Sequence, residues 1–182
     1  MTDWIGQFCF TTIYFLRIMA STLETLEDLF ELQLKDLYSA ENQLVKALPQ
    51  MASAANDETL RQSFETHLAE TQEQVARLEQ IGQSMNLELG GHTCAAMKGL
   101  VTEGQETMSE NASDEVMDAA LIAAAQRIEH YEIAGYGTAA NYAESLGYSE
   151  AATLLRQTLE EEQRTDTKLN DLAKSSINRK AL

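Results

Sequence analysis

The stretch that decides the fold is Gln126-Arg-Ile-Glu-His-Tyr-Glu-Ile-Ala-Gly-Tyr-Gly137, which lies inside a long helical pattern. Glu129 and Glu132 fall on or beside its apolar seam, and residues three apart lie on one face of a helix. Two carboxylates on a buried face are costly unless they are protonated, paired or bound to a cation. This conflict between an apolar pattern and acidic residues indicates a functional site. The seam consists of Leu121, Ile122, Ala125, Ile128, Ile133, Tyr136 and Ala140.

Composition limits the class of protein. The chain has 182 residues and a single proline, and its 29 acidic and 13 basic side chains give a formal net charge of −16. This composition is typical of one all-α domain built from long helices. So negative a charge disfavours nucleic acid and anionic membranes as partners, because phosphate binding needs a basic face. With only two cysteines no disulfide framework is indicated, and we expect a reducing, cytoplasmic location.

Residues 1–20 form an apolar N-terminal extension unlike the rest of the chain. The only basic residue near the apolar run, Arg17, follows it, whereas a secretory signal begins with basic residues. The run is also short and too polar for a membrane span. We interpret it as an upstream extension with Met19 as an alternative start. An apolar anchor formed by residues 1–18 is the alternative, and no other membrane contact is expected.

Four long helices are predicted after this extension. The first is expected from Ser21, Asp57 is expected to cap the second, Ser113 with Asp114 and Glu115 suits the N-terminus of the third, and Ser149 is expected to cap the fourth. Pro49 should kink or end the first helix, and Gly147 should stop the third. A short helix over residues 94–109 is expected in a long crossover between the second and third. The prediction is a four-helix bundle over residues 21–176, followed by a polar tail at 177–182 that frays.

Each long helix brings acidic residues to its inward face near its middle. Glu70 follows Glu41 by 29 residues and Glu162 follows Glu129 by 33, about the length of a helical hairpin that returns to the same depth. Di-iron and di-manganese carboxylate bundles have inward Glu residues on all four helices, and hard oxygen ligands suit these metals. We therefore predict a site for two iron ions, with manganese as the alternative metal. The candidate ligands are Glu41, His67, Glu70, Glu129, Glu132, Glu162 and Asp166.

Three segments also resemble a known family. They are Leu37-Tyr-Ser-Ala-Glu-Asn-Gln-Leu44, Ala119-Ala-Leu-Ile-Ala-Ala-Ala-Gln-Arg-Ile-Glu-His-Tyr-Glu-Ile-Ala134 and Thr158-Leu-Glu-Glu-Glu162. From Thr22 to about Lys180 the chain is similar to the YciF-type bacterial stress proteins of the ferritin-like superfamily. The resemblance implies a rubrerythrin-like four-helix bundle with a dinuclear metal site, a homodimer and a role in stress. In it, Glu129-x-x-Glu132 corresponds to the two-glutamate helix of rubrerythrins.

The sequence departs from the usual di-iron pattern at two positions. Glu-x-x-His is absent after Glu70 and Glu162, where the third residues on are Glu73 and Thr165. His67 instead precedes Glu70 by three residues, and Asp166 stands one turn after Glu162, in place of the missing imidazole. A site this rich in oxygen ligands should hold Fe(II) less tightly. Oxidase or peroxidase activity therefore does not follow from the resemblance.

A metal-free alternative stays open. Glutamates on alanine-rich helices are usually solvated, and in the run Glu160 to Glu162 only one member should point inward. In that case the chain is a helical dimer with a structural or interaction role in stress. Phosphate loops, nucleophile elbows and zinc-type Cys/His clusters are absent from the sequence. A redox reaction would also need an external electron donor, because the sequence has no rubredoxin-like cysteine cluster.

Overall fold

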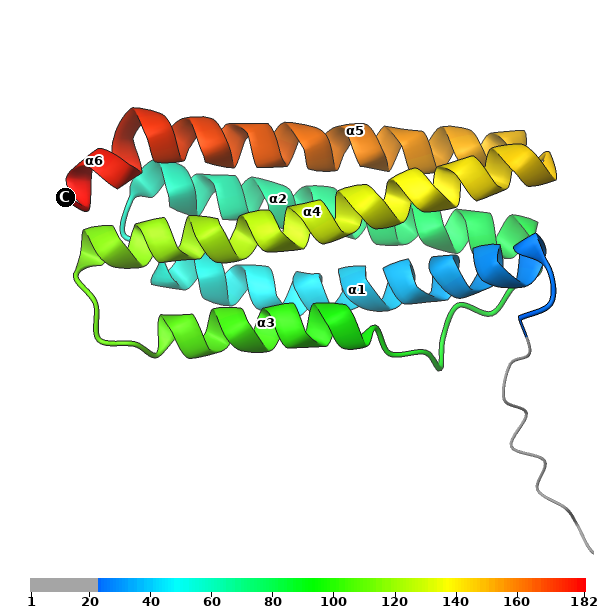
Figure 1. The fold of residues 1–182 in the computed structure, drawn as a ribbon, viewed down its shortest axis with the longest axis horizontal. Helices are drawn as coiled ribbons and strands as arrows, with labels where there is room; N and C mark the ends of the chain where they lie inside the picture. Colours follow the sequence, from blue (N-terminus) through cyan, green and yellow to red (C-terminus); the bar gives the residue numbers. More distant parts are fainter. Residues whose placement is uncertain (1–22) are drawn as a thin grey trace, which may run out of the picture.

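The computed structural model describes residues 23–182, and every element in this part of the chain is helical (Figure 1). The apolar extension at residues 1–20 lies outside it. The prediction of an all-α, ferritin-like four-helix bundle with a short helix in the crossover is confirmed. The elements are α1 (Leu26–Ala54), α2 (Glu58–Ser84), α3 (Ala95–Met108), α4 (Asp114–Leu146), α5 (Ser149–Leu172), a π-helical turn η1 (Ala173–Ile177) and α6 (Asn178–Lys180).

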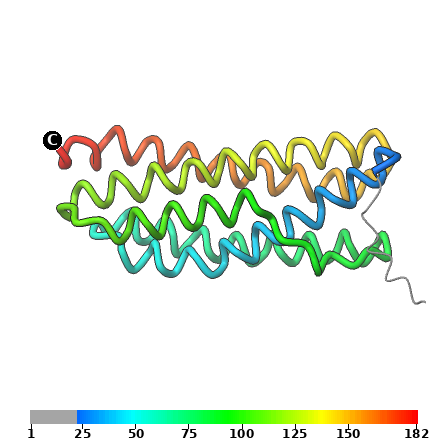
Figure 2. The backbone as a smooth tube through the Cα atoms, turned by 60° about the horizontal axis from the view of Figure 1, so that its bottom comes forward, coloured from blue at the N-terminus to red at the C-terminus, as the bar shows by residue number. Residues whose placement is uncertain are grey.

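The four long helices form two antiparallel hairpins, α1 with α2 and α4 with α5. Packing of α1 on α4 and of α2 on α5 closes the bundle. Because α2 ends at the opposite end of the bundle from the start of α4, the connection runs along its whole length (Figures 1 and 2). Helix α3 lies within this connection and packs outside the bundle against α1 and α4.

Helix α1 differs from the sequence prediction at both ends. It begins after Thr25, whose side chain accepts from the backbone N–H of Asp28 while the Asp28 carboxylate accepts from the backbone N–H of Thr25. At the other end α1 passes through Pro49 and continues to Ala54. Pro49 is exposed and near the end of the helix, so its missing N–H leaves one carbonyl that water can satisfy.

The predicted ends of the other long helices are mostly confirmed. Asp57 caps α2, Ser113 caps α4, and Gly147 ends α4 in the left-handed conformation with φ of 82°. The prediction that Ser149 caps α5 is wrong by one residue. Tyr148 occupies that position without a side-chain cap, and Ser149 is the first helical residue.

The C-terminal segment is ordered helix where a fraying polar tail was predicted. The turn η1 and α6 extend α5 to Lys180. Ile177 is 1% exposed because it continues the apolar face of α5 beyond Leu169 and Ala173. The ammonium of Lys180 lies 2.8 Å from the carboxylate of Asp57 at the start of α2. Burial of Ile177 and this ion pair therefore hold the segment against the bundle.

The core consists of two apolar clusters with a polar layer between them. One cluster contains Phe64, Leu121 and Ile128, and the other contains Phe30, Leu34 and Leu155. The buried polar and charged side chains of the layer include Glu41, His67, Thr71, Gln74, Glu129, Glu132 and Glu162. No helix in residues 23–182 combines the length and apolar character needed to cross a membrane.

Candidate metal centre

All four long helices contribute to the polar layer, which we call the carboxylate layer. It comprises Glu41 from α1, His67 from α2, Glu129 and Glu132 from α4, and Glu162 from α5. None of these residues is more than 2% exposed. One ligand atom each of His67, Glu129, Glu132 and Glu162 lies within 4.8 Å of the others. Ionised carboxylates gathered this closely away from water repel one another strongly unless protons or cations compensate them.

The carboxylate layer contains almost all the buried side-chain atoms without a hydrogen-bond partner in the described part of the chain. Buried polar atoms in folded proteins are nearly always satisfied, so such a concentration needs an explanation. A bound cation supplies one, because both oxygens of a carboxylate and one nitrogen of an imidazole are its ligands. The residues present therefore fit a metal. The partnerless atoms are Glu41 Oε2, His67 Nδ1 and Nε2, Gln74 Oε1, Glu129 Oε2, both oxygens of Glu132 and both oxygens of Glu162.

His67 stands at the edge of the layer with its two nitrogens facing different groups. Nε2 faces inward, 3.3 Å from Glu129 Oε1 and 4.0 Å from Glu162 Oε2, without the geometry of a hydrogen bond to either. Nδ1 faces outward, 3.9 Å from Glu70 Oε2. Burial lowers the pKa of His67, but Glu129, Glu70 and Glu162 together raise it well above its usual value. These neighbouring carboxylates therefore favour the protonated imidazole, against the effect of burial.

Glu41 has a hydrogen-bond donor of its own. The hydroxyl of Tyr136, on α4, donates to Glu41 Oε1 at 2.5 Å. Burial raises the pKa of Glu41 to about 7, although this hydrogen bond and the charge of His67 lower it. The side chain therefore changes between acid and carboxylate close to neutral pH.

The pKa values of Glu132 and Glu162 are also raised. Burial raises the pKa of Glu132 well above its usual value, and the charges of Glu41 and Glu162 raise it again. Burial likewise raises the pKa of Glu162, with Glu41 adding to the effect and His67 opposing it. In the metal-free protein the layer thus stores protons, and a divalent cation must displace them in order to bind.

Two of the predicted ligands lie outside the layer. The Glu70 side chain is 30% exposed and meets the layer only through His67. The Asp166 carboxylate accepts a hydrogen bond from Gln126 at 3.2 Å and lies 3.6 Å from His130 Nε2. The Asp166 carboxylate therefore contacts side chains of α4 outside the layer.

Glu161 is buried as well as Glu162, so the prediction that only one member of the acidic run points inward is wrong. Arg77 donates to both oxygens of Glu161, at 2.6 and 2.7 Å, and Gln74 donates to one of them at 3.3 Å. The paired guanidinium compensates the carboxylate locally. The ion pair joins α2 to α5 beside the layer, and Glu161 is therefore structural.

Sequence reasoning missed two sets of residues. Tyr136 was placed on the seam only as a core residue, although it stands one turn after Glu132 and can reach the same layer. The second set ties the crossover to the bundle. Asp36 accepts from the Tyr131 hydroxyl and lies 2.8 Å from His92 Nε2, and Cys94 Sγ lies 3.0 Å from the same hydroxyl. No sequence pattern joins these four residues, which come from three separate segments.

The fold and this layer define a ferritin-like helical bundle with a carboxylate-rich centre. The chain belongs to the family described as "Domain of unknown function (DUF892)", whose model matches residues 25–182. It is 51% identical over 160 residues to Protein YciF of Escherichia coli (strain K12), covering 87% of this chain and 96% of that protein. The similarity to YciF-type proteins inferred from sequence is thereby confirmed.

Solved structures agree with this assignment. The crystal structure of the Escherichia coli stress protein YciF matches with a TM-score of 0.83 at 51% identity, over 86% of this chain and 99% of that one. YcfI of Rhodopseudomonas palustris, described as a proposed structural protein, matches with a TM-score of 0.80 at 43% identity, over 83% and 96%. A protein from Xanthomonas campestris shares the fold at 20% identity with a TM-score of 0.68, over 87% and 100%.

Proposed function

We propose that this chain is a stress-response protein that binds two iron or manganese ions in the carboxylate layer. The observation that supports it best is the group of partnerless oxygen and nitrogen atoms in the layer. Four carboxylates would balance the charge of two divalent cations, and His67 would add one nitrogen ligand. When bound, such ions supply reaction with oxygen or peroxide, and the protein would use this chemistry to handle iron or reactive oxygen.

The chain's own residues would prepare the site in three ways. The apolar clusters on both sides of the layer exclude water, Tyr136 orients the Glu41 carboxylate, and His67 presents Nε2 to the interior. Displaced protons would leave from Glu41, Glu132 and His67 as the cations bind. We assign Asp166 and Glu70 no permanent place among the ligands.

The first experiment is elemental analysis of protein purified without chelators, followed by anaerobic titration with Fe(II) and exposure to air. We expect about two irons per chain and a higher melting temperature, because a ligand that binds only the folded state stabilises it. Glu162→Gln should lose most of both effects. Glu160→Gln is the matched control, because Glu160 lies two residues away on the same helix and is exposed. Metal at background level with an unchanged melting temperature would disprove the proposal.

A second candidate is a metal-free structural protein, which the description of the 43% identical relative YcfI favours. In this case protonated carboxyls would satisfy the layer, and the bundle would serve as a helical homodimer in stress. The same melts distinguish the two functions. Sedimentation showing a dimer that neither Fe(II) nor Mn(II) stabilises would favour this candidate.

Redox turnover would require an external electron donor. The described residues contain one cysteine, Cys94, and it is buried. Reduction of the ions would therefore depend on a second protein or a small reductant in the cytoplasm, where we place the protein.

A further inference from the structure

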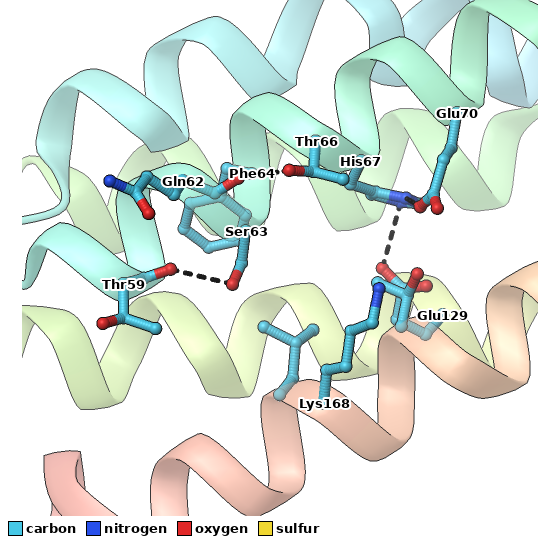
Figure 3. A pocket seen from close by; sticks show the side chains of 11 residues that line it. Thr59, Gln62, Ser63, Phe64, Thr66, His67, Glu70, Glu129 and Lys168 are labelled. Carbon is cyan, nitrogen blue, oxygen red and sulfur yellow. Dashed lines mark hydrogen bonds and ion pairs between the residues drawn. The ribbon is translucent and has the colours of Figure 1, made fainter.

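A pocket between α2 and α5 leads from the surface to the carboxylate layer. Its volume is about 170 Å³, which is several times the space that one water molecule needs. His67 and Glu129 form its inner end (Figure 3). We call this cavity the α2–α5 pocket. Its other walls combine polar side chains, among them Ser63, Thr66, Glu70 and Lys168, with the apolar side chains of Phe64 and Leu169.

The pocket lies on the most loosely packed of the four sides of the bundle. Arg77 and Glu161 tie α2 to α5 at one level, but the side chains of Ser63 and Thr165 further along are too short to fill the gap. The pocket reaches the only nitrogen ligand of the layer. His67 is 2% exposed, and its Nδ1, without a hydrogen-bond partner, faces the same side as Glu70.

The hydroxyl groups in the walls are arranged to accept hydrogen bonds. Ser63 Oγ donates to the backbone carbonyl of Thr59 at 2.8 Å, and Thr66 Oγ1 donates to that of Gln62 at 2.8 Å (Figure 3). Because their protons are used in this way, these oxygens present lone pairs toward the pocket. These hydroxyl oxygens are acceptors for the water molecules of a hydrated cation, which are donors, while Phe64 and Leu169 form the apolar part of the wall.

Glu70 is the carboxylate of this region that solvent reaches. Its side chain is 30% exposed, compared with 2% for Glu129 and 0% for Glu162. Glu70 Oε2 lies 3.9 Å from His67 Nδ1, so a cation held by Glu70 would be next to a residue of the layer. Lys168 also lines the pocket, and its charge lowers the pKa of Glu70 after the larger effect of His67 and against that of burial. Lys168 therefore opposes a cation at this position.

We propose that the α2–α5 pocket is the route by which hydrated divalent cations reach the carboxylate layer, with Glu70 as the first, transient ligand. The formal net charge of −16 draws cations to the molecule, and Glu70 selects the place where they lose water. The ion then passes His67 to Glu129. This inference rests on the proposed metal-binding function. It gives Glu70 a role in the rate of binding and none in the final stoichiometry.

The test is the rate of Mn(II) uptake by the full chain after chelator treatment, followed by loss of the free Mn(II) electron paramagnetic resonance signal. We expect Glu70→Gln to slow uptake by roughly tenfold, the scale of local electrostatic guidance, with unchanged final stoichiometry. Lys168→Gln should accelerate uptake, because it removes the opposing charge. The matched controls are Glu73→Gln on α2 and Lys174→Gln beyond α5, both exposed positions with the same changes of charge.

A steric variant tests the route without changing charge. Ser63→Phe, at a half-buried position in the pocket wall, should slow uptake and leave the melting temperature of the metal-free protein within a few degrees of wild type. Equal rates for Glu70→Gln and Glu73→Gln would overturn the inference, and so would a loss of bound Mn(II) in Glu70→Gln, which would make Glu70 a permanent ligand. If wild type binds neither Mn(II) nor Fe(II), the proposed function itself fails. If wild type binds and Ser63→Phe is as fast, only the route fails.

Discussion

At the scale of single residues, the hydrogen bond from Tyr136 to Glu41 affects the pKa of one carboxylate of the layer. It lowers the pKa of Glu41 against the larger effect of burial. Without it, Glu41 Oε1 would join Oε2 as a buried oxygen with no partner. A proton would then compete more strongly with any cation for this carboxylate.

Tyr136→Phe should therefore weaken Mn(II) binding by about tenfold, as the loss of a group that orients a ligand commonly does. It should also cost about 1–3 kcal/mol of the free energy of unfolding, the usual effect of leaving a buried acceptor unsatisfied. Titration with Mn(II) and urea unfolding measure the two effects. Tyr142→Phe, on the same helix and half-buried, is the control. Equal affinities in the two variants would contradict a role for Tyr136.

At the scale of helices, the approach of α4 to α1 depends on a glycine. A Cβ atom added at Gly135 would lie 2.8 Å from Leu37 Cδ2, and Leu37 is 1% exposed and cannot move freely. A Cβ atom added at Gly137 would lie 4.0 Å from Leu159 Cδ2, which is ordinary contact. These two glycines of the same helix therefore differ in role.

Gly135→Ala should lower the free energy of unfolding by about 1–2 kcal/mol, because overpacking exceeds the gain of about 1 kcal/mol in helix propensity. Gly137→Ala should raise it by up to about 1 kcal/mol, since only the propensity changes. Urea unfolding of the chelator-treated proteins measures both. Stabilisation of similar size in the two variants would show that α1 and α4 are less tightly packed at Gly135 than we describe.

At the scale of the whole molecule, the carboxylate layer couples stability to pH. The pKa of Glu41 is about 7 in the folded protein against an ordinary value of 4.5, so between these values the folded state binds more protons than the unfolded state. The free energy of unfolding then falls as pH rises. The raised pKa values of Glu132, Glu162 and His67 act in the same direction.

We expect the urea midpoint of the chelator-treated protein to decrease from pH 5 to pH 8. Repulsion among the many acidic side chains has the same sign, so Glu41→Gln separates the two effects. Its amide cannot ionise and still accepts from Tyr136, so this variant should have a flatter profile and exceed wild type in stability at pH 8. Superimposable profiles would mean that Glu41 does not ionise over this range.

Most of the fold could be predicted because helix boundaries follow local rules. Asp57, Ser113 and Gly147 stand where capping chemistry requires them, and the structure uses all three. Predictions failed where distant contacts override local preference. Ile177 is held by the bundle, and Glu161 is buried because Arg77 comes from another helix.

The sequence alone determined the class of helical bundle, the family resemblance and the presence of acids at mid-helix on four helices. Tertiary structure decided which of them share one buried layer. The layer includes Glu132, and Tyr136 donates a hydrogen bond to Glu41 within it. Asp166 lies outside the layer, and Glu70 lies in the wall of a pocket. The reason is geometric. Each residue turns a helix by about 100°, so whether a side chain points into the core depends on the rotation of each helix about its axis and on its shift along that axis relative to its neighbours. Local sequence does not encode those two quantities.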